Sequence, residues 1–381
     1  MVPIRKILLV TGGGDAPGLN AVTRAVVKHA ILSHGWKVVG SLEAFNGVLD
    51  DPMRVLPLDL TSVRGLLVRG GTILGTSNTG GPFESIQRRP DGEIEIVDRS
   101  DELIRRLSRT NFDAVISVGG DGSQRIAQKL FEKGLNIVGV PKTIDNDLHA
   151  TEMSFGFQTA VATATDAIDK LHSTGESHDR VMILEVMGRN AGWIALSSGI
   201  AGGADTILIP EIPFDIKRVV EHIDMRRRRG HHFAIVVVAE GAFPRGGGTV
   251  TAQSSRPGHP DPILGGIGRF VAEAIESESK LDTRVCVLGH LQRGGIPAPM
   301  DRLLATRFGV AAIDLVAEGR FGEMVALRAG DIVGIPIRDA ISHYRAVDLD
   351  DNLIRTARGL GICLGDTAPL TGDHPSVLPL E

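Results

Sequence analysis

The chain lacks the features that mark several protein classes. Among its 381 residues there are only 2 cysteines, Cys286 and Cys363, and aromatic residues make up 4%. Two cysteines exclude a disulfide framework and a cysteine-based metal site, so we expect a cytoplasmic protein. No apolar run is long enough to span a bilayer, and a strand-like run at residues 7–10 follows the N-terminus without a signal-peptide pattern. We therefore expect no membrane partner.

An excess of charge of either sign is also missing. The chain has 41 Lys and Arg against 46 Asp and Glu, a net charge of −5. This balance gives no electrostatic reason to expect a nucleic-acid partner. An anionic ligand must instead be bound by local structure.

Short apolar runs alternate with amphipathic stretches along the chain. This pattern predicts an α/β fold of two doubly wound lobes with mainly parallel sheets. The predicted strands are residues 7–10, 37–42, 114–118, 135–140, 181–186, 206–209, 233–238 and 285–288. The predicted helices are residues 19–33, 123–133, 158–171, 191–201, 216–229, 270–277 and 302–317. The pattern predicts surface loops at residues 78–101 and 243–268 and an irregular tail beyond residue 362.

Residues 141–147, Pro-Lys-Thr-Ile-Asp-Asn-Asp, follow the predicted strand at 135–140. In an extended segment Thr143, Asp145 and Asp147 would point to one side, at the strand end where open α/β sheets bind ligands. A hydroxyl and two carboxylates there suit a general base beside a charged site. The alternative is a group of helix-capping residues.

Glycine-rich turns follow two of the predicted strands and precede helices. One is residues 11–18, Thr-Gly-Gly-Gly-Asp-Ala-Pro-Gly, and the other is residues 119–123, Gly-Gly-Asp-Gly-Ser. Backbone amides and helix N-termini of this kind can bind a polyphosphate, although either turn alone can be a simple tight connection. Asp121 would face the phosphates, which favours an intervening Mg²⁺. Its alternative role is a helix cap.

Ionisable side chains also follow strands in the second half of the chain. Arginine can bind phosphate through two hydrogen bonds, and a carboxylate such as Glu240 can accept two sugar hydroxyls. Any single arginine can instead be a solvated ion pair, and a histidine can be a core residue. The candidate cations for a second phosphorylated ligand are Arg180, Arg189, Arg284, His290 and Arg293.

Together, residues 13–18, 119–122, 141–147, 187–189 and 289–293 resemble the motifs of the 6-phosphofructokinase family, in order from about residue 6 to about residue 309. The resemblance implies a two-lobe fold with the active site in the cleft, in a homo-oligomer that is a dimer or a tetramer. It implies transfer of the γ-phosphoryl group of ATP to the 1-hydroxyl of fructose 6-phosphate in glycolysis, with Mg²⁺. It also implies a donor lobe of residues 1–155 plus about 293–335, and a sugar-phosphate lobe of about 156–292 plus 336–381.

The resemblance also implies a role for individual residues, with Asp145 as the base for the 1-hydroxyl and Asp121 on Mg²⁺. The catalytic set is Asp145, Thr143, Asp147, Lys142 and Arg189. The donor set is Gly13, Gly14, Asn78, Gly120, Asp121, Gly122 and Ser123. The acceptor set is Thr143, Ile144, Asp145, Met187, Gly188, Arg189, Glu240, His290, Leu291, Gln292 and Arg293, joined by Arg180 and Arg284 from a neighbouring subunit.

Three positions bear on the donor. Asn78 stands where the family motif normally supplies an arginine to the transferring phosphate, and Lys142 resembles members that use pyrophosphate. Gly122 favours ATP, because pyrophosphate users generally carry Asp at that place. The combination of Gly122 with Lys142 resembles a subset of ATP-using members.

Other functions stay open at this point. One is a pyrophosphate-dependent phosphofructokinase, and another is a kinase for a related sugar phosphate such as sedoheptulose 7-phosphate. Lipid and NAD kinases also carry Gly-Gly-Asp-Gly, but the second set around Arg189 and Arg293 argues against them. A non-catalytic sugar-phosphate sensor is a further alternative, against which the presence of Asp121, Asp145 and Arg189 argues.

Overall fold

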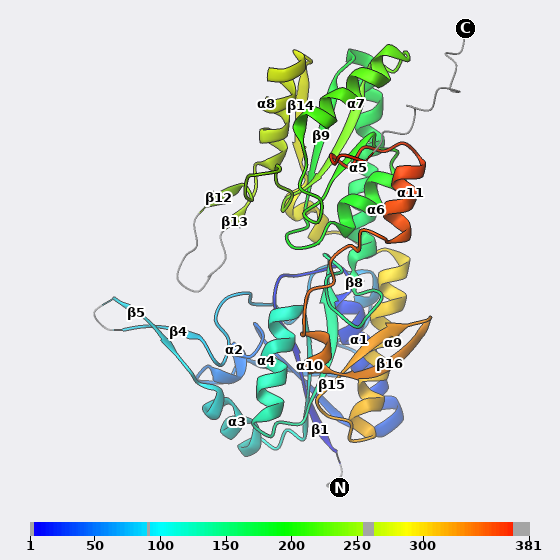
Figure 1. Cartoon of the computed structure of the whole chain (residues 1–381). Helices are drawn as coiled ribbons and strands as arrows, with labels where there is room; N and C mark the ends of the chain where they lie inside the picture. The colour runs from blue at the N-terminus through cyan, green and yellow to red at the C-terminus, as the bar shows by residue number, and fades with distance from the viewer. Residues whose placement is uncertain (1–3, 90–91, 254–262, 369–381) are drawn as a thin grey trace. The chain divides into compact units, whose positions relative to one another are not determined.

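The structure is a computed structural model that describes residues 4–89, 92–253 and 263–368, and the chain forms two compact units (Figure 1). Within the described residues, unit 1 contains residues up to 159 together with 293–344, and unit 2 contains the rest. Both units combine a mainly parallel sheet with helices. The predicted α/β fold is therefore confirmed.

Unit 1 is built on an eight-stranded sheet in the order β16-β15-β7-β6-β1-β2-β3, with β8 paired to β7. The central strands β2, β1, β6 and β7 are parallel, and the outer strands β3 and β16 are antiparallel to their neighbours. The strands are β1 (Lys6–Thr11), β2 (Lys37–Ser41), β3 (Val55–Leu58), β6 (Ala114–Gly119), β7 (Ile137–Thr143), β8 (Phe155–Gly156), β15 (Glu323–Arg328) and β16 (Asp331–Pro336).

Helices cover both faces of this sheet (Figure 1). Successive residues of β1 point to opposite faces, so Ile7 and Leu9 enter one apolar cluster while Leu8 and Val10 enter another. The first cluster is closed by α1 and α9, and the second by α3, α4 and α10. Unit 1 is thus doubly wound. Its helices are α1 (Leu19–His34), α2 (Asn46–Leu49), η1 (Leu66–Val68), α3 (Ser100–Arg109), α4 (Asp121–Glu132), α9 (Pro299–Ala317) and α10 (Ile337–Ala340).

Unit 2 is built on a smaller, fully parallel sheet in the order β10-β11-β9-β14. On one face, residues of β9 and β11 such as Ile183 and Val236 pack against Val219 of α7 and Val271 of α8. The strands are β9 (Val181–Val186), β10 (Thr206–Leu208), β11 (Ala234–Ala239) and β14 (Thr283–Val287). The helices are α5 (Phe157–His178), α6 (Trp193–Ala201), α7 (Ile216–Arg228), α8 (Ile267–Ser279), η2 (Gly289–Arg293) and α11 (Asn352–Gly359).

A half-buried carboxylate fixes the returning C-terminal segment onto unit 2. The Glu211 carboxylate accepts hydrogen bonds from the backbone N–H of Gly192 at 3.0 Å and of Val347 at 2.8 Å. The indole N–H of Trp193 donates to the Arg345 carbonyl at 2.8 Å. Burial raises the pKa of Glu211 above its usual value. These bonds hold the chain where it leaves unit 1 and enters unit 2.

Several predicted elements were wrong in extent or missing. The two segments predicted as loops contain strand pairs, β4 (Ser85–Arg88) with β5 (Ile94–Val97), and β12 (Thr251–Gln253) with β13 (Ile263–Leu264). The hairpin of β4 and β5 extends away from the body of unit 1 (Figure 1). It buries little apolar surface, which is why no clear alternation marked it in the sequence. Most of the predicted irregular tail lies outside the described residues.

No membrane-crossing segment was found among the helices of the described ranges, because none is both long and apolar enough.

Two glycine-to-alanine changes should affect stability differently, because Gly309 is packed against α1 and Gly359 has free space around it. A Cβ on Gly309 of α9 would lie 2.7 Å from the Ala25 Cβ and 2.9 Å from the Val22 carbonyl oxygen of α1. Gly309→Ala should therefore lower the free energy of unfolding by about 1–3 kcal/mol. Gly359 of α11 has no atom within 4 Å of such a Cβ, so Gly359→Ala should be neutral or stabilise by up to about 1 kcal/mol. Urea unfolding of both variants measures this, and equal stabilities would contradict it.

Candidate active site

The first glycine-rich turn is held in place by backbone hydrogen bonds at its start. The N–H of Gly12 donates to the Val118 carbonyl at 2.9 Å, and the N–H of Gly13 donates to the Ser77 carbonyl at 2.9 Å. Gly13 and Gly18 have φ angles of 76° and 110°, which favour glycine. Gly18 caps α1 without a side-chain hydrogen bond. The N-terminus of α1 is thus suited to an anion.

Two cationic side chains contact this turn. The Lys142 ammonium group donates to the Gly14 carbonyl, and the Arg293 guanidinium donates to the Asp15 carbonyl at 3.0 Å. Lys142 is 3% exposed, and burial, together with the charge of Arg293, lowers its pKa to about 8. Lys142 is therefore mostly charged at neutral pH. The sequence analysis predicted that Arg293 binds a second phosphorylated ligand. In the structure Arg293 contacts the first glycine turn.

The second glycine-rich turn is shorter than predicted. Strand β6 continues to Gly119 and α4 begins at Asp121, so Gly120 alone connects them. The two turns are adjacent, because a Cβ on Gly12 would lie 2.8 Å from the Ser123 Oγ and one on Gly119 would lie 2.4 Å from it. Gly122 lies in the first turn of α4, and a Cβ there would meet nothing within 4 Å.

A small cavity of about 40 Å³ lies beside the two turns. Its walls come from both turns, from the segment after Thr76 and from α4. Asn78 is exposed and does not line the cavity, although its neighbours Ser77 and Thr79 do. The lining residues are Val10, Gly12, Ala44, Phe45, Asn46, Ser77, Thr79, Gly80, Gly81, Ser117, Ser123 and Ile126.

The acidic segment after β7 is a turn, not the extended strand that was predicted. β7 ends at Thr143, and the N–H of Asp145 donates to the Thr143 hydroxyl at 3.1 Å. Asn146 has a φ of 54°, a conformation that Asn tolerates better than most residues. Its side-chain oxygen accepts a hydrogen bond from the Ser154 N–H at 3.1 Å, which fixes the turn. The Ile144 side chain is fully buried, so it anchors the turn.

Negative charge accumulates in this turn. Burial, and next the charge of Asp145, raise the pKa of Asp147 to about 7, against the hydrogen bond from Thr143. The charge of Asp121 raises it further. One of these carboxyl groups can therefore carry a proton near neutral pH, which suits proton transfer.

Asp121 occupies the first turn of α4, while Gly120 is the capping residue, so the helix-cap alternative is not observed. Its carboxylate pairs with the Arg125 Nε at 2.7 Å and the side chain is 14% exposed. Arg125 was missed by sequence reasoning, although its spacing of four residues from Asp121 on a helix was a usable signal. The oxygen atoms of Asp121, Asp145 and Asp147 are the type of donor that Mg²⁺ prefers, so the residues fit this ion.

Unit 2 gathers a second group at the carboxyl ends of its strands. The N–H of Glu240, after β11, donates to the Val186 carbonyl at 2.9 Å, and Gly188, after β9, has a φ of 137°. The side-chain oxygen of Gln292 accepts a hydrogen bond from the Met187 N–H at 2.8 Å. Gln292 is fully buried, so it positions the backbone of Met187.

The remaining predicted residues of unit 2 do not all join this group. Arg180 lies just before β9, and Arg284 lies near the start of β14. Both pair with Asp282, Arg180 through its Nε at 2.6 Å. The six residues of β9 span about 20 Å, so Arg180 and Arg284 lie about this far from the carboxyl end of the strand. Within one chain, Arg180 and Arg284 therefore do not lie with Arg189 at the carboxyl ends of the strands. His290 and Leu291 are exposed.

Comparisons with known proteins agree with this geometry. The family model described as Phosphofructokinase matches residues 6–316. The chain is 49% identical to "ATP-dependent 6-phosphofructokinase 1" of Synechocystis sp., over 96% of this chain and all of that protein. It is 47% identical to "Pyrophosphate--fructose 6-phosphate 1-phosphotransferase" of Amycolatopsis methanolica, over 90% of this chain and 96% of that one. The crystal structure of Pichia pastoris phosphofructokinase in the T-state matches with a TM-score of 0.76 and 32% identity, over 90% of this chain and 36% of that chain.

The electrostatic coupling in the acidic turn predicts how Asp147 titrates. Asp145→Asn removes the nearer negative charge, so the pKa of Asp147 should fall from about 7 but stay above its usual value because burial persists. Asp121→Asn is the matched control and should lower this pKa by less, since Asp121 contributes less than Asp145. NMR titration of ¹³C-labelled Asp carboxyls measures both. An unchanged Asp147 midpoint in Asp145→Asn would show that the two groups are not coupled.

Proposed function

Because the chain belongs to the phosphofructokinase family, we propose that it transfers the γ-phosphoryl group of ATP to the 1-hydroxyl of D-fructose 6-phosphate. The products are ADP and fructose 1,6-bisphosphate, as in glycolysis. The observation that carries the proposal is the cluster in unit 1, where two glycine-rich turns lie beside Lys142 and the acidic turn. This cluster combines anion binding, a buried cation and a proton acceptor.

The donor phosphates are bound by the two turns and the N-termini of α1 and α4, with Gly13, Gly14, Gly120 and Ser123 closest to them. Lys142 lies against Gly14 and supplies positive charge to the transferring phosphoryl group, in place of the arginine absent at Asn78. Asp121, assisted by Asp147, would hold Mg²⁺, which when bound offsets charge on the donor phosphates.

Asp145 is the general base. It takes the proton of the 1-hydroxyl as that oxygen forms a bond to the γ-phosphorus and the bond from this phosphorus to the β–γ bridging oxygen of ATP breaks. Thr143 holds the turn by accepting the Asp145 N–H, so the base is positioned before substrate arrives. Phosphoryl transfer depends mainly on positioning and charge stabilisation, which this arrangement supports.

The acceptor is bound by the group at the carboxyl ends of the unit 2 strands. Glu240 accepts sugar hydroxyl hydrogens, and Met187, Gly188 and Arg189 shape the site after β9. His290 contributes to binding of the 6-phosphate. Gln292 acts indirectly, since its oxygen is bonded to the Met187 N–H. Leu291, 68% exposed, borders this group.

Arg180 and Arg284 serve the acceptor site of a neighbouring subunit in a homo-oligomer. Two observations support this role. Both residues lie at the opposite end of the unit 2 strands from Met187 and Glu240 of their own chain. Both also bond Asp282, so their guanidinium groups are held together and offer a combined site for a phosphate.

The donor cannot be chosen by overall identity, because an ATP-named relative is 49% identical and a pyrophosphate-named relative is 47% identical. One local observation favours ATP. Gly122 leaves open space in the first turn of α4, where a side chain would otherwise stand beside the donor phosphates. Pyrophosphate is the second candidate, favoured by Lys142.

Asp145→Asn should keep fructose 6-phosphate binding but lower kcat by roughly 10²–10⁴, the usual contribution of a general base. The amide cannot accept the proton, while its size and turn geometry are preserved. Coupled assays of fructose 1,6-bisphosphate formation measure kcat, and calorimetry checks that the acceptor still binds. Turnover near that of the wild type would remove Asp145 from this role.

Gly122→Asp should depress turnover with ATP far more than any residual turnover with pyrophosphate. The side chain fits the open space, and Asp is favourable in the first turn of a helix, so the variant should fold. Its charge would repel a nearby phosphate. Gly122→Asn has the same size without the charge and should retain most ATP use.

The test measures the initial rates of the wild type and both variants with fructose 6-phosphate and either donor, at saturating Mg²⁺. A wild type that turns over with pyrophosphate alone would overturn the ATP assignment. A wild type inactive with both donors would overturn the enzyme proposal itself. Parallel reactions with sedoheptulose 7-phosphate test the acceptor.

A further inference from the structure

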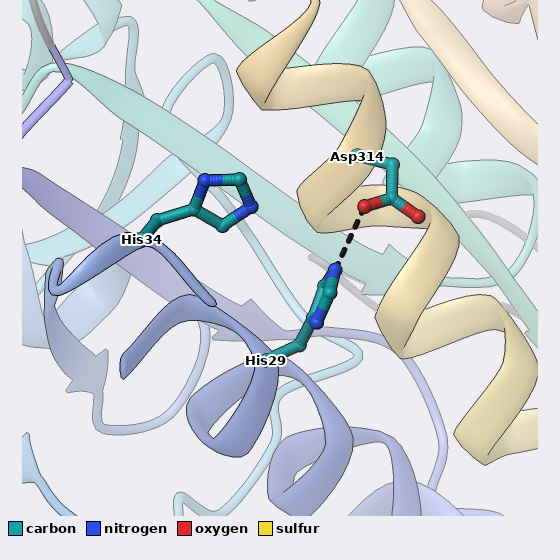
Figure 2. A group of neighbouring side chains, drawn as sticks. All are labelled: His29, His34 and Asp314. Atoms are coloured by element: carbon teal, nitrogen blue, oxygen red, sulfur yellow. Dashed lines mark hydrogen bonds and ion pairs between the residues drawn. The ribbon is translucent and has the colours of Figure 1, made fainter. Parts of the chain in front are cut away.

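A second group of potential metal ligands lies where α1 ends beside α9. His29 and His34 belong to α1 and Asp314 belongs to α9. One ligand atom from each residue lies within 4.8 Å of the others (Figure 2). His29 is about 15 Å along α1 from its first residue, so this group is separate from the glycine turn that precedes the helix.

Part of the group is already fixed by hydrogen bonds. The His29 Nε2 lies 2.7 Å from an Asp314 carboxylate oxygen, and the Ser33 Oγ lies 3.0 Å from the His29 Nδ1. Metal-bound histidines typically have such a partner on the second ring nitrogen, which sets the ring orientation. The His34 ring stacks on Trp36 with 4.4 Å between ring centroids. All three ligand side chains therefore have defined neighbours.

We propose that His29, His34 and Asp314 bind one divalent transition-metal ion such as Zn²⁺. Two imidazoles and one carboxylate are a suitable donor set for this ion, and water would complete its coordination. Ligand atoms around tetrahedral Zn²⁺ lie about 3.3 Å apart. The His29 Nε2 and the Asp314 oxygen, 2.7 Å apart, would therefore separate slightly, and a ligand atom as far as 4.8 Å from them would move in by about 1–2 Å. The exposed His34 can supply this movement by side-chain rotation. The ion would bind the His29 Nε2 with the ring hydrogen on Nδ1, which faces the Ser33 Oγ at 3.0 Å.

The ion would cross-link two helices that belong to one apolar cluster. Val22 of α1 and Phe308 of α9 are both fully buried in that cluster. An ion that binds the folded protein only, and spans both helices, shifts the folding equilibrium toward the native state. Zn²⁺ should therefore raise the thermal unfolding midpoint.

The competing explanation is an ordinary ion pair between His29 and Asp314 with His34 nearby by coincidence. The side chains of His29 and Asp314 are 23% and 50% exposed, which is usual for such a pair. An ion pair makes no use of His34, whereas a metal site loses one of its three protein ligands when His34 is removed. His34→Ala therefore separates the two explanations. Its side chain is exposed, so the variant should fold.

The test uses the full chain freed of metal by a chelator and titrated with Zn²⁺ by calorimetry and with Co²⁺ by visible absorption. The wild type should bind one equivalent and give the intense bands of low-coordinate Co²⁺. His34→Ala and Asp314→Asn should each weaken binding at least 10-fold, the scale of losing a supporting metal contact. His178→Ala is the matched control, because His178 is also an exposed histidine at the end of a helix. It should bind like the wild type.

Binding at the carboxylates of Asp121, Asp145 and Asp147 would persist in His34→Ala, so it is distinguishable from the proposed site. The proposal fails if the wild type shows no such equivalent, or if His34→Ala binds it as tightly as the wild type and His178→Ala do. If the thermal unfolding midpoint of the wild type does not rise when Zn²⁺ is bound, the proposed cross-link between α1 and α9 is wrong.

Discussion

The parallel pairing of β1 with β6, and of β6 with β7, is the constraint on which the unit 1 site depends. Thr11 pairs with Val118 and Val118 pairs with Val140, so the three strands end at the same edge of the sheet. The two glycine turns and the acidic turn then emerge side by side. Residues about 130 positions apart in sequence, Gly14 and Lys142, are bonded as a direct result.

At this edge of the sheet, side chains of like charge lie close together and repel each other while no ligand is bound. Lys142 and Arg293 contact the first turn, and burial, together with the charge of Arg293, lowers the pKa of Lys142. Burial, and next the charges of Asp145 and Asp121, raise the pKa of Asp147. A polyphosphate would relieve the repulsion between the cations, and a cation such as Mg²⁺ would relieve that between the carboxylates. A site that binds both at once gains from both effects, and the proposed phosphoryl transfer needs this kind of charge compensation.

The sequence predicted the features that short patterns encode and missed those that depend on tertiary contacts. Apolar runs such as residues 181–186 located buried strands, and runs of glycine located both turns that precede α1 and α4. The conformation of the acidic segment could not be predicted, because Asn146 adopts its positive φ through a bond to Ser154. The position of Arg293 depends on the distant Asp15 carbonyl. The bonds of Arg180 and Arg284 to Asp282 likewise depend on the pairing of β14 with β9, which brings the two arginines together.

Helix α1 links the first glycine turn to α9, which lies about 280 residues later in the sequence. Its first residue follows the glycine turn, and its last turn carries His29 and His34 beside Asp314 of α9. Between these ends, α9 approaches so closely that Gly309 has no room for a side chain. Because helices are stiff over this length, the contact with α9 fixes the axis of α1 and thereby the position of the turn that precedes it. Packing at Gly309 is therefore a condition for the geometry of the first glycine turn, which we propose binds the donor phosphates.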